Sequence, residues 1–155
     1  PILYLSQHIN ARRNEYYALL RGVTDTAAWE PWILFMLDAV ENTSRSTAQK
    51  IAAIDTLLNE TVRHVRTALP KIYTRELVDF LFTQPYCRIS DLIRHKFAGH
   101  RNTAAKYLKD LATADVLEPR KEGREMLYLN KRFLDLLTRE GSEFPPYPAA
   151  PIAAA

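Results

Sequence analysis

The sequence predicts a mainly α-helical protein: a helical segment with a long amphipathic helix, then a winged helix-turn-helix domain with a small β-hairpin wing. Three observations lead to this. Apolar residues recur at steps of three and four over residues 31–69. A helix, a short helix, a tight turn and a longer helix can be traced over 72–115. Two short apolar runs then flank a charged tip containing Gly123.

The first segment, from Ile2 to about Val23, has apolar residues near helical spacing. It predicts one or two short helices, and Gly22 lies where a helix would end. The polar run over 10–15 is expected to be a solvated helical turn or a bend.

The second segment is the long helix, and Pro31 suits its first turn because proline lacks an N–H. One face is expected to be buried along its whole length, with the stripe Ile33, Leu37, Val40, Ser44, Thr47, Ile51, Ile54, Leu58, Val62, Val65 and Leu69. Residues 42–47 are its predicted weak point, because Asn, Thr and Ser compete for backbone hydrogen bonds.

The third segment begins after Pro70, which would interrupt a continuing helix. Ser90 is the expected N-cap of its second, short helix. The predicted elements are helices over 72–82, 90–97, 101–115 and 131–138, a turn over 98–100, strands over 116–119 and 126–129, and a wing tip over 120–124. Domain boundaries follow at 1–69 and 70–140.

Residues 141–155 are rich in Pro and Ala and lack periodicity, so we expect a disordered tail. Within it, Pro145-Pro146-Tyr147 also has the composition of a ligand for a partner domain.

The net charge of +3 is unevenly distributed. Residues 1–69 carry seven Lys and Arg against seven Asp and Glu, whereas residues 86–132 carry eleven against six, an excess of five. This favours a local anionic partner, although a solvated face is the alternative. The candidate contact residues for nucleic acid or another partner are Arg101, Asn102, Thr103, Lys106, Lys109, Arg120, Lys121 and Arg124.

The composition, 47% hydrophobic and 25% charged in 155 residues, is typical of a globular protein that can bury a core. No apolar run approaches the roughly 20 residues of a membrane span. The single cysteine, Cys87, excludes an internal disulfide and a thiolate metal cluster, so we expect a cytoplasmic protein without a metal site.

Several stretches resemble the region after the active site in Fic-family proteins, in the subgroup with a C-terminal winged helix. They are Pro1-Ile2-Leu3-Tyr4-Leu5-Ser6, Glu15-Tyr16-Tyr17-Ala18-Leu19-Leu20, Trp29-Glu30-Pro31-Trp32-Ile33, Leu69-Pro70-Lys71-Ile72-Tyr73 and Thr103-Ala104-Ala105-Lys106-Tyr107-Leu108. The resemblance covers most of the chain, up to Leu137.

Fic proteins transfer AMP from ATP, with magnesium, to a hydroxyl of a target protein. Their His-x-Phe-x-x-Gly-Asn-Gly-Arg loop supplies the general base and the phosphate cradle. None of the four histidines here is followed by that pattern. The resemblance therefore implies the C-terminal piece of an adenylyltransferase. We expect no catalytic residue, catalysis or cofactor in this chain alone, and ATP and Mg in an intact parent enzyme.

The same resemblance places tyrosines at the positions of Tyr16 and Tyr17 near the adenine, and Trp29 is a weaker candidate for that wall. Packing of these rings in a helical bundle is the alternative.

Three functions stay open. The winged domain could bind double-stranded DNA, with the helix from Arg101 in the major groove. It could instead recognise a target protein of the enzyme or mediate dimerisation, and a stand-alone winged-helix transcriptional regulator is the alternative to a part of an enzyme. The long striped helix could also join two copies in a homodimer, or pack on a catalytic bundle.

Overall fold

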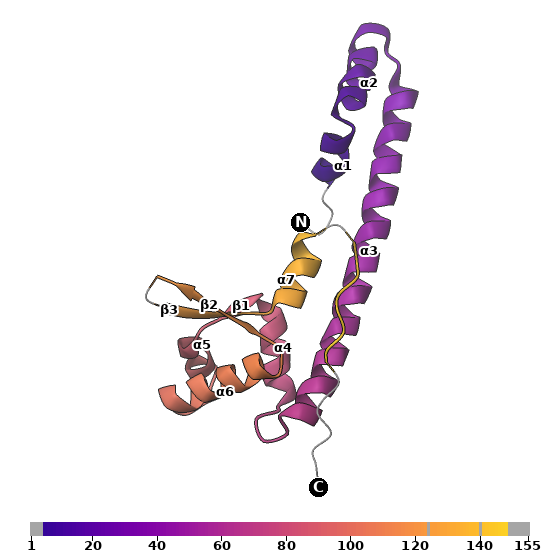
Figure 1. Cartoon of the computed structure of the whole chain (residues 1–155). Coiled ribbons are helices and arrows are strands. Elements are labelled where there is room, and N and C mark those ends of the chain that lie inside the picture. The colour runs from indigo at the N-terminus through magenta and orange to yellow at the C-terminus, as the bar shows by residue number, and fades with distance from the viewer. Residues whose placement is uncertain (1–4, 124, 140, 149–155) are drawn as a thin grey trace. The chain divides into compact units, whose positions relative to one another are not determined.

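The computed structural model describes residues 5–123, 125–139 and 141–148. These residues are mainly helical, with one small antiparallel sheet (Figure 1). The chain divides into two compact units, Pro1–Ile51 and Ala52–Ala155. The 40-residue helix α3 (Trp29–Ala68) contributes its first part to unit 1 and its second part to unit 2.

Unit 1 contains α1 (Leu5–Ala11), α2 (Arg13–Thr26) and the first part of α3. The predicted helix end at Gly22 is wrong, because α2 continues to Thr26. Ala27 ends the helix in the left-handed conformation, at φ 52°, and its N–H donates to the Val23 carbonyl. Within the polar run over 10–15 only Arg12 lies between the helices, because Asn10 and Ala11 end α1 and residues 13–15 begin α2.

The apolar stripe predicted along α3 is only partly correct. In unit 1 the buried α3 residues are Phe35 and Ala39, whereas Ile33, Leu37 and Val40 are at least 40% exposed. Periodicity locates apolar faces but does not say which face the neighbouring helices cover. In unit 2 the prediction fits better: Val65 is fully buried, and the half-buried Ile54, Leu58 and Val62 pack on the core clusters.

The predicted weak point over 42–47 does not interrupt α3. Asn42 Nδ2 donates to the Asp38 carbonyl and to Asp38 Oδ1. Its local hydrogen bonds therefore form within the helix rather than in competition with it.

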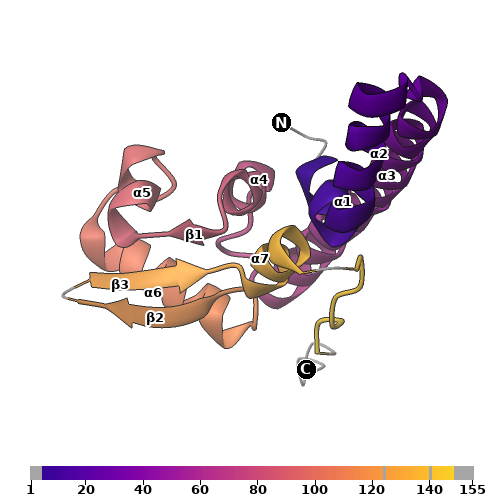
Figure 2. The same ribbon diagram turned by 90° about the horizontal axis from the view of Figure 1, so that it is seen from above.

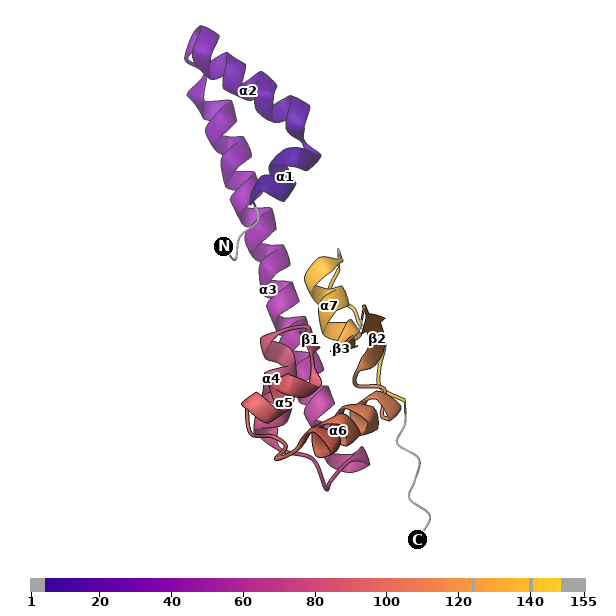
Figure 3. The same ribbon diagram turned by 90° about the vertical axis from the view of Figure 1, so that its left-hand side faces the viewer.

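Unit 2 gathers smaller elements around the second part of α3 (Figure 3). They are α4 (Arg75–Thr83), β1 (Tyr86–Cys87), α5 (Ile89–Arg94), α6 (Arg101–Thr113), β2 (Glu118–Glu122), β3 (Glu125–Leu129) and α7 (Lys131–Thr138). Their core consists of fully or nearly fully buried side chains, among them Leu77, Leu81, Leu92, Leu108 and Leu111.

The sheet has the order β1-β3-β2, with both pairs antiparallel. The predicted hairpin is present as β2 and β3, whereas β1 was not expected: it has only two residues and pairs Tyr86 with Leu129. The hairpin strands are displaced toward the tip: β2 begins at Glu118, while Val116 and Leu117 are buried in the core. Gly123 turns the chain at φ 60°, a conformation that favours glycine.

Several helix boundaries in unit 2 differ from expectation. Helix α4 begins at Arg75, after its N-cap Thr74, rather than at Ile72, and α5 ends at Arg94 rather than at Phe97. The N-cap of α5 is Arg88 rather than Ser90, since Asp91 Oδ2 accepts a hydrogen bond from the Arg88 N–H. The helix expected over 101–115 ends at Thr113, and Asp115 then adopts φ 59°.

The tail expected to be disordered behaves differently over residues 141–148, and residues 149–155 lie outside the described part of the chain. Residues 141–148 form no helix or strand, yet Phe144 and Tyr147 pack against the core clusters of unit 2. Two aromatic side chains supply enough apolar surface to fix a short segment that composition alone marks as disordered.

Candidate functional site

Helix α6 forms because Ala104, Leu108 and Leu111 lie on one face and are completely buried. Its N-cap residue, His100, has an extended backbone and makes no side-chain capping bond. The first turn also contains no acidic residue. The N–H groups at the start of α6 therefore remain available to an anion, which the helix dipole favours at this end.

The outer face of α6 carries most of the candidate contact residues. Arg101, Asn102, Lys106 and Lys109 are exposed, and Thr103 is half-buried. Within the described part of the chain, no ion pair involves Arg101, Lys106 or Lys109. These three cations can thus meet an external anion without breaking an internal contact.

Unlike the cations of α6, most cations on or beside the hairpin form ion pairs with carboxylates of the same chain. Arg120 lies 3.8 Å from Glu122, Arg88 lies 3.0 Å from Glu125, and Lys131 lies 3.4 Å from Glu118. Lys121 is exposed and has no ion pair among the described residues. Arg124 lies outside them.

The start of α6 and the turn of the hairpin are on the same side of unit 2 (Figures 1 and 2). A ligand that reached both would meet the free cations of α6 and Lys121.

The three residues predicted to line a nucleotide site lie in unit 1. Tyr16 is half-buried and packs edge-to-face on Tyr17, with ring centroids 5.5 Å apart. Tyr17 is 53% exposed. Trp29 is 56% exposed and contacts Trp32, and no ring contact among the described residues joins it to the tyrosines. The structure therefore brings Tyr16 and Tyr17 together but leaves Trp29 apart from them.

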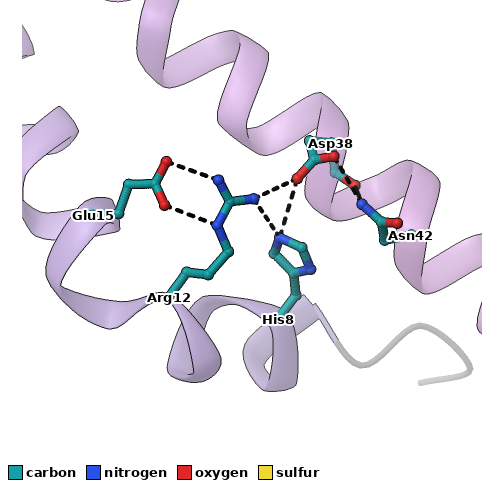
Figure 4. A network of polar contacts seen from close by, with 5 residues as sticks. All are labelled: His8, Arg12, Glu15, Asp38 and Asn42. Atoms are coloured by element: carbon teal, nitrogen blue, oxygen red, sulfur yellow. Dashed lines mark hydrogen bonds and ion pairs between the residues drawn. The ribbon is translucent and has the colours of Figure 1, made fainter.

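A polar network beside Tyr16, which sequence analysis did not identify, links the three helices of unit 1 (Figure 4). Arg12 binds both carboxylate oxygens of Glu15 at 2.8 Å and donates to Asp38 Oδ2. His8 Nε2 lies 3.4 Å from the same Asp38 oxygen. The hydrogen bond and the charge of Glu15, and after them those of Asp38, raise the pKa of Arg12 above its usual value.

The network and Tyr16 meet at the ring of Phe35. The Arg12 guanidinium lies 4.8 Å from the Phe35 ring centroid, and Tyr16 packs on that same ring at 6.0 Å. Arg12 and His8 of the network therefore contact the same Phe35 ring on which Tyr16 packs.

The described residues contain no group of three or more His, Cys, Asp and Glu that could hold a metal ion. None of their helices is long and apolar enough to span a membrane.

Residues 57–133 match the family model described as "Protein adenylyltransferase SoFic-like, C-terminal domain". The matched region runs from the second part of α3 to the start of α7 and includes all of α6 and the hairpin.

Proposed function

We propose that this chain, which belongs through residues 57–133 to the SoFic-like C-terminal domains of protein adenylyltransferases, is a recognition module that binds double-stranded DNA through α6. The single observation that carries the proposal is the exposed α6 face with Arg101, Lys106 and Lys109 free of ion pairs among the described residues.

The proposal treats residues 70–140 as a winged helix-turn-helix domain. The order α4-β1-α5-α6-β2-β3 and the strand order β1-β3-β2 support this assignment. In such domains the helix in the position of α6 enters the major groove, and the hairpin touches the backbone. Asn102 and Thr103 would then lie near base edges, while Lys106, Lys109 and Lys121 would contact phosphates.

Titration of fluorescent duplex DNA at several salt concentrations tests the proposal. Each phosphate contact contributes about 0.9 to the slope of log K against log salt. Lys106→Ala combined with Lys109→Ala should reduce that slope by about 2 and weaken binding to unrelated sequences equally. Lys71→Ala, which removes an exposed lysine outside α6, is the matched control and should leave the slope unchanged.

A second candidate function, recognition of a protein target, is favoured by the hairpin. Arg120, Arg88 and Lys131 are satisfied by Glu122, Glu125 and Glu118, so the hairpin offers DNA little free charge. If wild type binds no duplex DNA even at low salt, this second candidate replaces the first.

Enzymatic activity belongs, in this proposal, to an intact parent that uses ATP and Mg to transfer AMP to a protein hydroxyl. Unit 1 would contribute Tyr16 and Tyr17, and less directly Trp29, to the adenine wall. The contact between Tyr16 and Tyr17 supports the idea, because an exposed aromatic face beside a half-buried one is suited to stacking a base. An ATP analogue should then protect Tyr17 from chemical iodination in the parent enzyme but not in the chain alone.

A further inference from the structure

Tyr147 is held by three residues of unit 2. Its ring stacks on His64, with centroids 4.4 Å apart and planes 10° from parallel. The Arg132 guanidinium lies 4.2 Å from the same ring centroid. The Tyr147 hydroxyl is 2.8 Å from Oγ1 of the fully buried Thr61. Burial raises the pKa of this hydroxyl above its usual value.

The two prolines before Tyr147 are recognised through their carbonyls. Proline has no N–H, so the carbonyl oxygens are the backbone groups of Pro145 and Pro146 that need partners. Arg132 donates to both, from Nε to Pro145 at 2.9 Å and from the Nη2 nitrogen to Pro146 at 3.4 Å.

Arg132 is itself held in place, because its two terminal nitrogens donate to the Asp115 carbonyl and to Asp115 Oδ2, each at 2.6 Å. His64 is fixed in the same way by a 2.7 Å contact with the Ala114 carbonyl. The residues that contact the tail are thus anchored by contacts that do not involve the tail.

Phe144 supplies the apolar anchor of the segment. It packs on a buried cluster from α3 and α7, made of Ala53, Leu57, Phe133 and Leu136. A hollow of about 380 Å³ beside Pro145 and Arg132 remains open and is lined further by Asp115, Lys131 and Asp135. The surface on which residues 144–147 pack therefore continues into this hollow.

We propose that this groove, formed by α3, the end of α6 and α7, is a peptide-binding site for an extended Phe-Pro-Pro-Tyr segment of a partner protein. In the structure, residues 144–147 of the same chain occupy this groove. Aromatic contacts and donors aimed at proline carbonyls are the means by which proline-rich ligands are recognised. The resident segment forms no helix or strand, so a segment of the same chemistry can replace it.

A separate peptide must compete with residues 144–147, which belong to the same chain. A short linker gives such an attached segment an effective concentration of the order of millimolar. This sets the design of the test, which does not depend on DNA binding. A labelled peptide with the sequence of residues 141–148 is titrated into the full chain carrying Phe144→Ala and Tyr147→Ala, and into wild type.

The double variant should bind the peptide at least tenfold more tightly than wild type. Replacing Tyr with Ala in the peptide should abolish binding. Adding Arg132→Met to the double variant should weaken binding at least tenfold. Adding Arg66→Ala, which removes an exposed arginine of the same unit, should not.

Equal affinity of wild type and the double variant would overturn the proposal, as would a folded double variant that binds no peptide. A concentration-dependent dimer of wild type that the peptide dissociates would assign the groove to a second copy and overturn the assignment to a separate partner. If circular dichroism shows the double variant unfolded, Tyr147→Ala alone, which keeps Phe144 in its cluster, is tested in the same way.

Discussion

Cys87 shows how burial determines the chemistry of a single residue. Its side chain is 2% exposed, and desolvation, with a smaller contribution from Asp91, raises its pKa to about 12. The thiol is therefore neutral at physiological pH and cannot act as a reactive thiolate. We interpret Cys87 as a small core residue.

The raised pKa of Cys87 predicts a loss of stability in alkali. The unfolded thiol ionises near pH 8.5 to 9, while the folded thiol stays protonated up to about pH 12. Its contribution is thus complete below the unfolded pKa and declines as the pH rises toward the folded one. Between pH 8 and pH 10 wild type should lose about 1.5 kcal/mol more than Cys87→Ala in urea unfolding. An equal loss in both proteins would contradict this.

At the level of elements, α7 depends on one buried polar side chain. Asn130 is 1% exposed, and its Oδ1 accepts from the Phe133 N–H at the start of the helix. Its Nδ2 donates to the Leu81 carbonyl at the end of α4. One side chain therefore caps α7 and joins it to α4.

Replacing Asn130 should cost more than replacing an ordinary cap. Asn130→Ala removes the cap and leaves the buried Leu81 carbonyl without its partner, which should cost about 2–3 kcal/mol of unfolding free energy. Thr74→Ala removes only the exposed cap of α4 and should cost about 1 kcal/mol. Chemical denaturation measures both, and equal losses would show that the contact with Leu81 is unimportant.

An element can be predicted from the sequence when the contacts that form it lie close together in the chain. Helix α6 could be predicted because its buried face repeats within 13 residues. The buried face of α3 in unit 1 could not, because His8 of α1 and Tyr16 of α2 pack on Phe35 while apolar Leu37 stays exposed. The strand β1 owes its existence to pairing with β3, more than 40 residues later.

In the candidate site, too, features that depend on nearby residues could be predicted, and features that depend on distant residues could not. The cations of α6 could be recognised from the local charge excess, whereas the ion pairs that neutralise the hairpin depend on neighbours across the sheet and from other elements. The contact between Arg12 and Asp38 joins residues 26 positions apart, and no local pattern indicates it. The attachment of Tyr147 depends on Thr61, 86 positions earlier.

At the scale of the whole molecule, the two units carry different features. Unit 1 carries the paired tyrosines and the Arg12 network, and unit 2 carries the free cations of α6 and the groove filled by residues 144–147. Because the two surfaces of unit 2 use different residues, loss of DNA binding and loss of peptide binding should be separable by mutation.

The central claim, that α6 contacts DNA, is tested most directly by amide NMR of the full, isotope-labelled chain titrated with duplex DNA at low salt. The account predicts the largest shifts at the amides of residues 101–109 and at Lys121, reversed by added salt, because the first turn of α6 lacks a capping side chain. A complex that forms while these amides stay unchanged, with shifts on α4 and α5 instead, would contradict it.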